Sequence, residues 1–169
     1  MENQNMENTV STINTSIKQI PALFNKISIA ENEIIINFGC GRYPELIEDK
    51  FSDNSVISYD PLYDGGNSFV LTTQEELHHT TSYLDGNGVV MCANVLNVLT
   101  DDLLALVIGQ LKTLCKSGAV VNVGIYEGDK SGNGNPTKKG YQRNERAKEY
   151  IKHFAGFNVV RKSNILIIK

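Results

Sequence analysis

The sequence predicts an α/β fold: a doubly wound, mostly parallel sheet with helices on both faces and an antiparallel strand pair at its C-terminal end. Short, nearly continuous apolar runs, typical of buried parallel strands, alternate with segments whose apolar residues recur every three or four positions, as on a helix face. The last two apolar runs are separated only by Lys162-Ser163, a tight turn that suits antiparallel strands. With 169 residues, 41% of them hydrophobic, the chain has the size of one domain with one core.

The N-terminal part divides into a tail and two helical segments. Residues 1–8 are polar and acidic and predict a disordered tail, which leaves 9–169 as the single domain. Between Thr9 and Lys26 the apolar residues follow helical spacing, which Pro21 interrupts. We therefore expect one helix ending near Gln19 and a second one starting at Pro21.

The rest of the chain alternates between strands and helices. Five apolar runs predict the parallel strands, in the order Glu33–Phe38, Ser55–Tyr59, Asn67–Leu71, Val89–Cys92 and Ala119–Ile125. Two more predict the closing antiparallel pair, Phe157–Arg161 and Asn164–Ile168. Helices are expected over Pro44–Phe51, Gln74–Tyr83, from Thr100 as cap to Gly118 as stop, and over Asn144–Ala155. The stretch from Glu127 to Gly140 is rich in Gly, Asn, Lys and Ser and is expected to be a mobile loop.

Charge is distributed unevenly along the chain. From Lys130 to the end there are ten basic and two acidic residues, a net charge of +8, whereas the remainder carries −11. Such a split indicates an anionic partner, such as a nucleic acid or nucleotide, on one side of the molecule. The alternative is a solvated basic helix that pairs with the acidic body.

Several classes of protein are disfavoured. No apolar run approaches the roughly 18 residues of a membrane span, and the polar start does not resemble a signal peptide. Three cysteines, Cys40, Cys92 and Cys115, are an odd number without close pairing, which argues against a disulfide scaffold or a zinc site and for a cytoplasmic location. His78 and His79 are adjacent on a predicted helix and so diverge by about 100°, and we expect no metal.

The functional site is expected beyond the carboxyl ends of the strands, where ligands bind in doubly wound sheets. The loop after the first strand carries Gly39 and Gly41, whose missing side chains let the backbone turn sharply and approach a ligand. Asp60 ends the second strand, nineteen residues after Gly41. A carboxylate there can accept from both hydroxyls of a ribose, an interaction worth about 2–4 kcal/mol. These features predict a nucleoside cofactor.

The class of cofactor is predicted from a departure from the dinucleotide-binding fingerprint and from a resemblance to a known family. A dinucleotide fingerprint requires a third glycine where Pro44 stands, and a closing strand pair is foreign to a nicotinamide-binding domain. After about residue 30 the chain instead resembles the class I S-adenosylmethionine-dependent methyltransferases, which have a Rossmann-like sheet. The resemblance lies in Asn37-Phe38-Gly39-Cys40-Gly41, Tyr59-Asp60-Pro61, Asn94–Leu99 and the terminal strand pair. More narrowly, small methyltransferase-like proteins of phages and prophages look similar over Ala93–Val98, Tyr126–Gly132 and Tyr141–Asn144.

The resemblance implies S-adenosylmethionine as cofactor and assigns roles to individual residues. Gly39, Cys40 and Gly41 would line its methionine and ribose part, Asp60 would hold the ribose diol, and Pro61 would lie on the adenine. Asn94 and Asn97 would sit beside the methionine end, and Gln19–Ala22 would close over the cofactor. Asn37 stands where the family has Asp or Glu, and Tyr43 where a third loop glycine is common. The Asn/Asp-Pro-Pro-aromatic motif of amino-directed DNA methyltransferases is missing, since Val95 follows Asn94.

Groups after strand ends are the candidates for the acceptor side. The sulfonium is already activated, so the protein has mainly to place a nucleophile in line with the methyl group. We expect Asn94 and Glu127 to act in catalysis. Substrate-binding candidates flank the predicted mobile loop: Tyr126, Gln142, Arg143 and Asn144. Two other functions stay open: a protein that binds S-adenosylmethionine as a sensor, sequestering agent or scaffold without methyl transfer, and a nicotinamide-dependent reductase.

Overall fold

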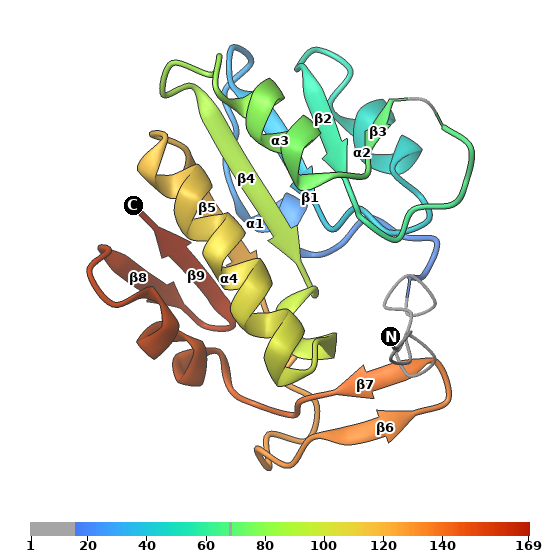
Figure 1. Cartoon of the computed structure of the whole chain (residues 1–169), viewed down its shortest axis with the longest axis vertical. Coiled ribbons are helices and arrows are strands. Elements are labelled where there is room, and N and C mark those ends of the chain that lie inside the picture. The colour runs from blue at the N-terminus through green and yellow to red at the C-terminus, as the bar shows by residue number, and fades with distance from the viewer. Residues whose placement is uncertain (1–15, 68) are drawn as a thin grey trace, which may run out of the picture.

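The computed structural model describes residues 16–67 and 69–169, which form a seven-stranded sheet in the order β3-β2-β1-β4-β5-β9-β8 (Figure 1). The strands are β1 Ile34–Phe38, β2 Val56–Tyr59, β3 Val70–Leu71, β4 Gly88–Ala93, β5 Val120–Gly124, β8 Val159–Lys162 and β9 Ile165–Ile168. The first five are parallel, β9 is antiparallel to β5, and β8 is antiparallel to β9. The predicted doubly wound sheet with an antiparallel C-terminal pair is confirmed.

Helices cover both faces of the sheet. Successive strand residues point to opposite faces, and both sets are apolar, so each face needs a helical cover. The helical elements are α1 Leu23–Lys26, α2 Glu45–Lys50, α3 Gln74–Thr81, the 3₁₀ helix η3 Leu96–Val98, α4 Asp101–Lys116 and the 3₁₀ helix η4 Ala147–Phe154. Ile36 and Val90 pack in the cluster under α3, α4 and η4, whereas Ile35 and Val89 pack under α1 and α2. Figure 1 shows α4 in front of the sheet and α1 behind it.

The longest helix, α4, follows the expected pattern closely. Its buried residues Leu104, Ile108, Leu111 and Leu114 recur at intervals of three and four, which places them on one face against β4 and β5. Gly118 follows with a φ of +97°, a left-handed conformation that suits glycine at a helix end.

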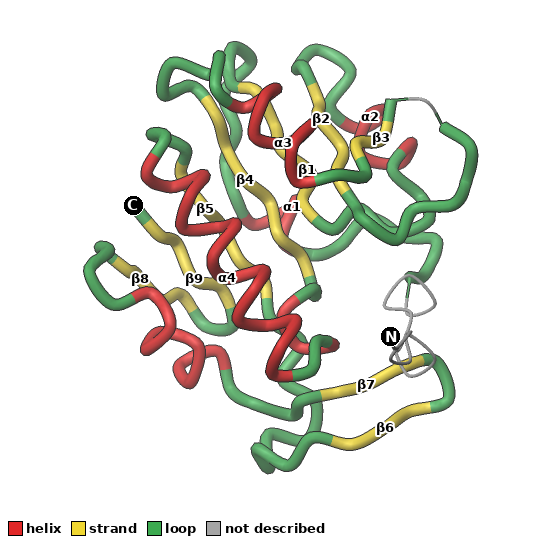
Figure 2. Tube along the Cα trace, viewed as in Figure 1, coloured by secondary structure: helices red, strands yellow, loops and turns green. Residues whose placement is uncertain are grey.

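Two expectations about the connections are wrong. Ser16–Ile20 are not helical, and Ile17 is 56% exposed, so the expected helix ending near Gln19 is absent from its described part; the rest of that helix and the tail over 1–8 lie outside the described residues. The expected mobile loop from Glu127 to Gly140 contains a strand of the hairpin β6 Asn135–Thr137 and β7 Gly140–Gln142 (Figure 2).

The segment expected as an α-helix over 144–155 is shorter and of the 3₁₀ type. In η4, Ala147 and Tyr150 are fully buried at an interval of three, which matches three residues per turn. The backbone N–H of Ala147 donates to Glu127 Oε1 at 2.8 Å, so a side chain from the β5 exit satisfies the start of η4.

Candidate functional site

The loop after β1 turns back against the end of β2. Gly39 and Gly41 have φ angles of +69° and +66°, which only glycine adopts without strain. The N–H groups of Gly39 and Cys40 both donate to the Tyr59 carbonyl, at 2.7 and 3.1 Å. A Cβ atom on Gly39 would collide with the Val95 side chain. The glycines are therefore required both for the turn and for the close approach of neighbouring groups.

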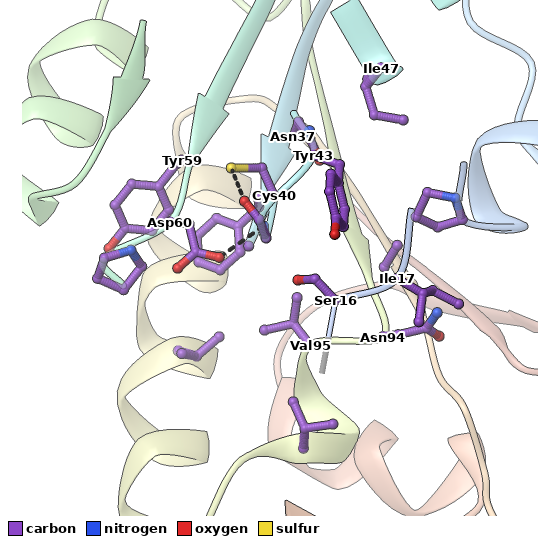
Figure 3. Close-up of a pocket in the computed structure, with 18 of the residues that line it drawn as sticks. Ser16, Ile17, Asn37, Cys40, Tyr43, Ile47, Tyr59, Asp60, Asn94 and Val95 are labelled. Atoms are coloured by element: carbon purple, nitrogen blue, oxygen red, sulfur yellow. Dashed lines mark hydrogen bonds between the residues drawn. The ribbon is translucent and has the colours of Figure 1, made fainter. Parts of the chain in front are cut away.

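Asp60 lies beside this loop, directly after β2. Its Oδ2 accepts the Gly41 N–H at 3.0 Å (Figure 3), and its Oδ1 accepts the Leu62 N–H at 2.9 Å. The side chain is buried, which raises its pKa above the ordinary 3.8, while the two backbone N–H groups act in the opposite direction. The expected proximity of residues 39–41 and Asp60 is confirmed.

A pocket of about 170 Å³ opens at the carboxyl ends of β1, β2 and β4, between the glycine loop and α4. Asp60 and Pro61 line it together with the glycine loop. Its apolar wall consists of Leu46, Ile47, Val95, Val98, Leu99 and Val107. A pocket with one buried carboxylate, backbone groups and an apolar wall suits a ligand that has both polar and apolar parts.

Asn37 lines the pocket and carries a buried amide nitrogen without a partner in residues 16–67 and 69–169. The residue is 5% exposed, and its Nδ2 atom is buried without a hydrogen-bond partner among the described residues. A buried amide that lacks a partner costs about 1–3 kcal/mol. Such an atom is typical of a site in which a ligand completes the hydrogen bonding.

The N-terminal segment from Ser16 to Pro21 also reaches the pocket. Ser16 Oγ accepts the Arg42 N–H at 3.3 Å and lies where a Cβ atom on Gly41 would be. Ile17, Gln19 and Pro21 line the pocket as well. This segment thus lies against the glycine loop through Ser16, and Figure 3 labels Ser16 and Ile17 at the pocket.

The candidate cofactor-binding residues are brought together with one exception. Asn37, Gly39, Cys40, Gly41, Asp60, Pro61 and Asn94 all line the pocket. Asn97 does not line it: this residue is 2% exposed, its Nδ2 donates to Gln142 Oε1 at 3.3 Å, and its Oδ1 accepts the Tyr126 N–H at 3.3 Å. Asn97 thus joins η3 to the exit of β5 and to β7.

Of the two candidate catalytic residues, only Asn94 reaches the pocket. It is exposed, has a φ of +58°, and its N–H donates to the Gly124 carbonyl at 2.8 Å at the end of β4. Glu127 lies outside, where it accepts the Ala147 N–H and lies 3.6 Å from Lys130 Nζ.

The candidate substrate-binding residues form a connected group next to the pocket. Arg143 donates to Glu145 at 2.9 Å, to Asp101 at 2.9 Å and to the Leu99 carbonyl at 3.0 Å. Asn144 is buried and donates to the Asn133 carbonyl at 2.9 Å. Neither residue lines the pocket, and their substrate role, like those of Tyr126 and Gln142, stays a prediction.

The structure adds pocket residues that were not singled out for the site. Ser16 and Ile17 come from the segment taken as a helix, and Tyr43 projects into the middle of the view in Figure 3. Gln110 on α4 is 8% exposed and donates to the Tyr59 hydroxyl at 3.3 Å. The sequence offers one signal for Gln110: it is a polar residue on the apolar face of a predicted helix.

No family model and no curated protein matches the chain. A solved structure from Thermobifida fusca YX, called a "putative methyltransferase", is similar at 12% identity with a TM-score of 0.44, covering 77% of this chain. The matched part is 60% of that protein's length. The strand order and the antiparallel C-terminal pair make the fold class I methyltransferase-like.

Among residues 16–67 and 69–169, no group of three or more His, Cys, Asp or Glu side chains is placed to hold a metal ion. Within the same residues, no helix combines the length and apolarity needed to cross a membrane.

Proposed function

We propose that the protein binds S-adenosylmethionine in the pocket beside Asp60 and transfers its methyl group to an acceptor at the carboxyl edge of the sheet. The observation that supports this most is the 3.0 Å hydrogen bond between Gly41 N and Asp60 Oδ2, which joins a carboxylate to a glycine loop. Each Asp60 oxygen accepts one backbone N–H and keeps a further lone pair for a ligand hydroxyl. The proposal includes a cytoplasmic location, for which the cysteine content argues.

The residues fit the adenosyl part of such a cofactor. Asp60 would accept from the ribose diol, and Pro61 and the apolar wall would pack against the adenine ring. Asn37 also lines the pocket, and its amide nitrogen, which is buried without a partner in the described part of the chain, would gain one from a ligand acceptor that reaches the end of β1. When bound, the cofactor supplies an activated methyl group.

The small volume of the pocket requires part of its wall to move when the cofactor binds. A cavity of about 170 Å³ is smaller than the roughly 300–1,000 Å³ of typical small-molecule sites. Four of the lining residues, Ser16, Ile17, Gln19 and Pro21, come from the segment before α1 and belong to neither a helix nor a strand nor a strand-end loop. We therefore propose that this segment moves away from Gly41 when the cofactor binds.

The residues expected near the methyl acceptor bear on whether the protein transfers the methyl group or only binds the cofactor. Asn94 is exposed beside the pocket and is placed to hydrogen-bond an acceptor. Glu127, the candidate base, is occupied by the Ala147 N–H and Lys130. The engagement of Glu127 and the uncharged Asn37 favour the second candidate function, an S-adenosylmethionine-binding protein without methyl transfer.

Calorimetry and a transfer assay separate these functions. Binding of S-adenosylmethionine and its demethylated product, together with radiolabelled methyl transfer into DNA, RNA or metabolite extracts, is expected for the enzyme. Binding without transfer into any of the three would support the second function. Preference for NAD(H) over S-adenosylmethionine would overturn both and favour a reductase.

A further inference from the structure

A second cavity lies apart from the pocket, between the Lys130–Gly132 turn and the start of η4. It measures about 300 Å³, and we call it the basic recess. Its charged lining residues comprise four cations and two anions: Lys130, Arg146, Lys148, Lys152, Glu145 and Glu149. The lining thus has a surplus of two positive charges, in a chain whose net charge is −3.

Two of the four cations of the basic recess have an acidic neighbour: Lys130 lies 3.6 Å from Glu127, and Lys148 lies near Glu149. Lys148 lies 3.7 Å from Glu149, and both side chains are about half exposed, so this pair contributes little. Glu145 is bound by Arg143, whose Nε lies 2.9 Å from it. Within the part of the chain that the structure describes, no ion pair is found for Arg146 or Lys152. A concave surface with uncompensated cations attracts anions.

Tyr126 lies along the chain between the edge of the pocket and the basic recess. It comes two residues after Gly124, the last residue of β5, whose carbonyl accepts the Asn94 N–H. The turn after Tyr126, closed by the 3.0 Å hydrogen bond from Lys130 N to the Glu127 carbonyl, leads directly into the recess.

The side chain of Tyr126 is 61% exposed, although its backbone is fixed on both sides. Its N–H donates to Asn97 Oδ1 at 3.3 Å, and its carbonyl accepts from Gln142 Nε2 at 3.1 Å. An exposed aromatic ring on a fixed backbone loses little entropy on binding and offers a flat face for stacking. Tyr126 lies at the carboxyl edge of the sheet, which is the edge at which an acceptor must arrive.

We propose that the basic recess and Tyr126 bind single-stranded nucleic acid, with a phosphate in the recess and a base stacked on the Tyr126 ring. A base is free to stack on a side chain only when it is unpaired, which selects single strands over duplexes. A neighbouring nucleotide then reaches Asn94 at the mouth of the pocket. The inference rests on the proposed function, because it names the class of methyl acceptor; DNA and RNA share this chemistry.

The phosphate part is tested by fluorescence anisotropy with labelled single strands of about 12 nucleotides, as DNA and as RNA, without cofactor. The variant carrying Arg146→Gln and Lys152→Gln is compared with a control carrying Lys116→Gln and Lys169→Gln, which removes equal charge at the opposite edge of the sheet. Loss of two phosphate contacts is expected to flatten the slope of log affinity against log salt by about 1.4. Equal slopes for the two variants would overturn the assignment of the basic recess.

The stacking part is tested with Tyr126→Ala and Tyr126→Phe. Tyr126→Ala is expected to weaken single-strand binding by about 5- to 150-fold, whereas Tyr126→Phe keeps the affinity. Both variants keep the backbone groups that Asn97 and Gln142 bind, so their thermal melting should match the wild type. An abasic strand should bind Tyr126→Ala and wild type equally. Tighter binding of duplex than of single strand, or no loss in Tyr126→Ala, would refute stacking.

The two proposals fail separately. Calorimetry with S-adenosylmethionine alone reports on the pocket, and anisotropy without cofactor reports on the basic recess. Cofactor binding with no affinity for DNA or RNA strands would refute only the nucleic-acid inference. Strand binding that Tyr126→Ala and the recess variant weaken, with no cofactor binding, supports the nucleic-acid site and refutes the proposed function.

Discussion

The substitution Asp60→Asn separates cofactor binding from folding. The amide has nearly the shape of the carboxylate but no charge, and only one of its two terminal atoms accepts hydrogen bonds. Asp60 now accepts two backbone N–H groups, from Gly41 at 3.0 Å and from Leu62 at 2.9 Å. The amide of the variant could accept only one of them, and its NH₂ group would face the other donor.

The magnitudes for affinity and stability differ. Losing two charge-assisted hydrogen bonds to a ribose diol costs about 2–4 kcal/mol, which is about a 30- to 700-fold loss of affinity. Stability should change by only about 1 kcal/mol, because removal of a desolvated charge offsets the lost backbone hydrogen bond. Burial already raises the pKa of Asp60, which shows that its charged form is disfavoured there.

Isothermal titration calorimetry with S-adenosylmethionine measures the affinity, and urea denaturation measures the free energy of unfolding. Asp53→Asn serves as the control, since Asp53 is exposed just after α2 and the substitution changes the net charge equally. Unchanged affinity in Asp60→Asn would remove this carboxylate from the cofactor site. A loss of affinity that equals the loss in stability would mean that the substitution acts through folding.

Three other substitutions or conditions test neighbouring parts of the structure. Gly41→Ala should lose cofactor affinity and more stability than Gly66→Ala, because both glycines have positive φ but only Gly41 faces Ser16; an equal unfolding free energy would contradict this. Arg143→Lys should lower the unfolding free energy in urea by about 2–4 kcal/mol, because the bonds to Glu145 are lost. An unchanged value would show that these bonds do not stabilise the fold. Affinity for S-adenosylmethionine should fall as the pH drops through the pKa of Asp60, which burial raises above 3.8, and Asp60→Asn should abolish that dependence. The contribution of Asp60 to stability should instead rise over the same pH range, because the folded state binds the proton more tightly than the unfolded state does.

The sheet was predictable because its strands are buried on both faces. The run Ile34-Ile35-Ile36 has apolar side chains toward α1 and α2 as well as toward α4, which leaves a continuous apolar pattern in the sequence. The β6–β7 hairpin was missed because its strands are three residues long and largely polar, with all of Asn135–Thr137 exposed. Through Gln142, β7 also bonds to Asn97 of η3 and to the Tyr126 carbonyl after β5, contacts between distant residues that no local pattern encodes.

The site also has a part that was predictable from the sequence and a part that was not. The glycine loop and Asp60 are set by backbone geometry at strand ends, so their residue types reveal them. The covering segment at Ser16 was not predictable, because its position depends on a contact with Arg42 across 26 residues of sequence. Helical spacing before Pro21 gave the opposite interpretation.

Polar residues after strand ends serve two purposes that sequence cannot separate. Asn97, Glu127 and Arg143 use their side chains to join η3, the β5 exit, η4 and the start of α4 into one block. That block holds Tyr126 and Asn94 at the carboxyl edge, exposed to solvent on fixed backbone. Substitutions in the block should therefore lower stability and acceptor binding together, whereas substitutions of Tyr126 should lower acceptor binding alone. This difference, measured by melting temperature against strand affinity, identifies which of these residues contact the acceptor.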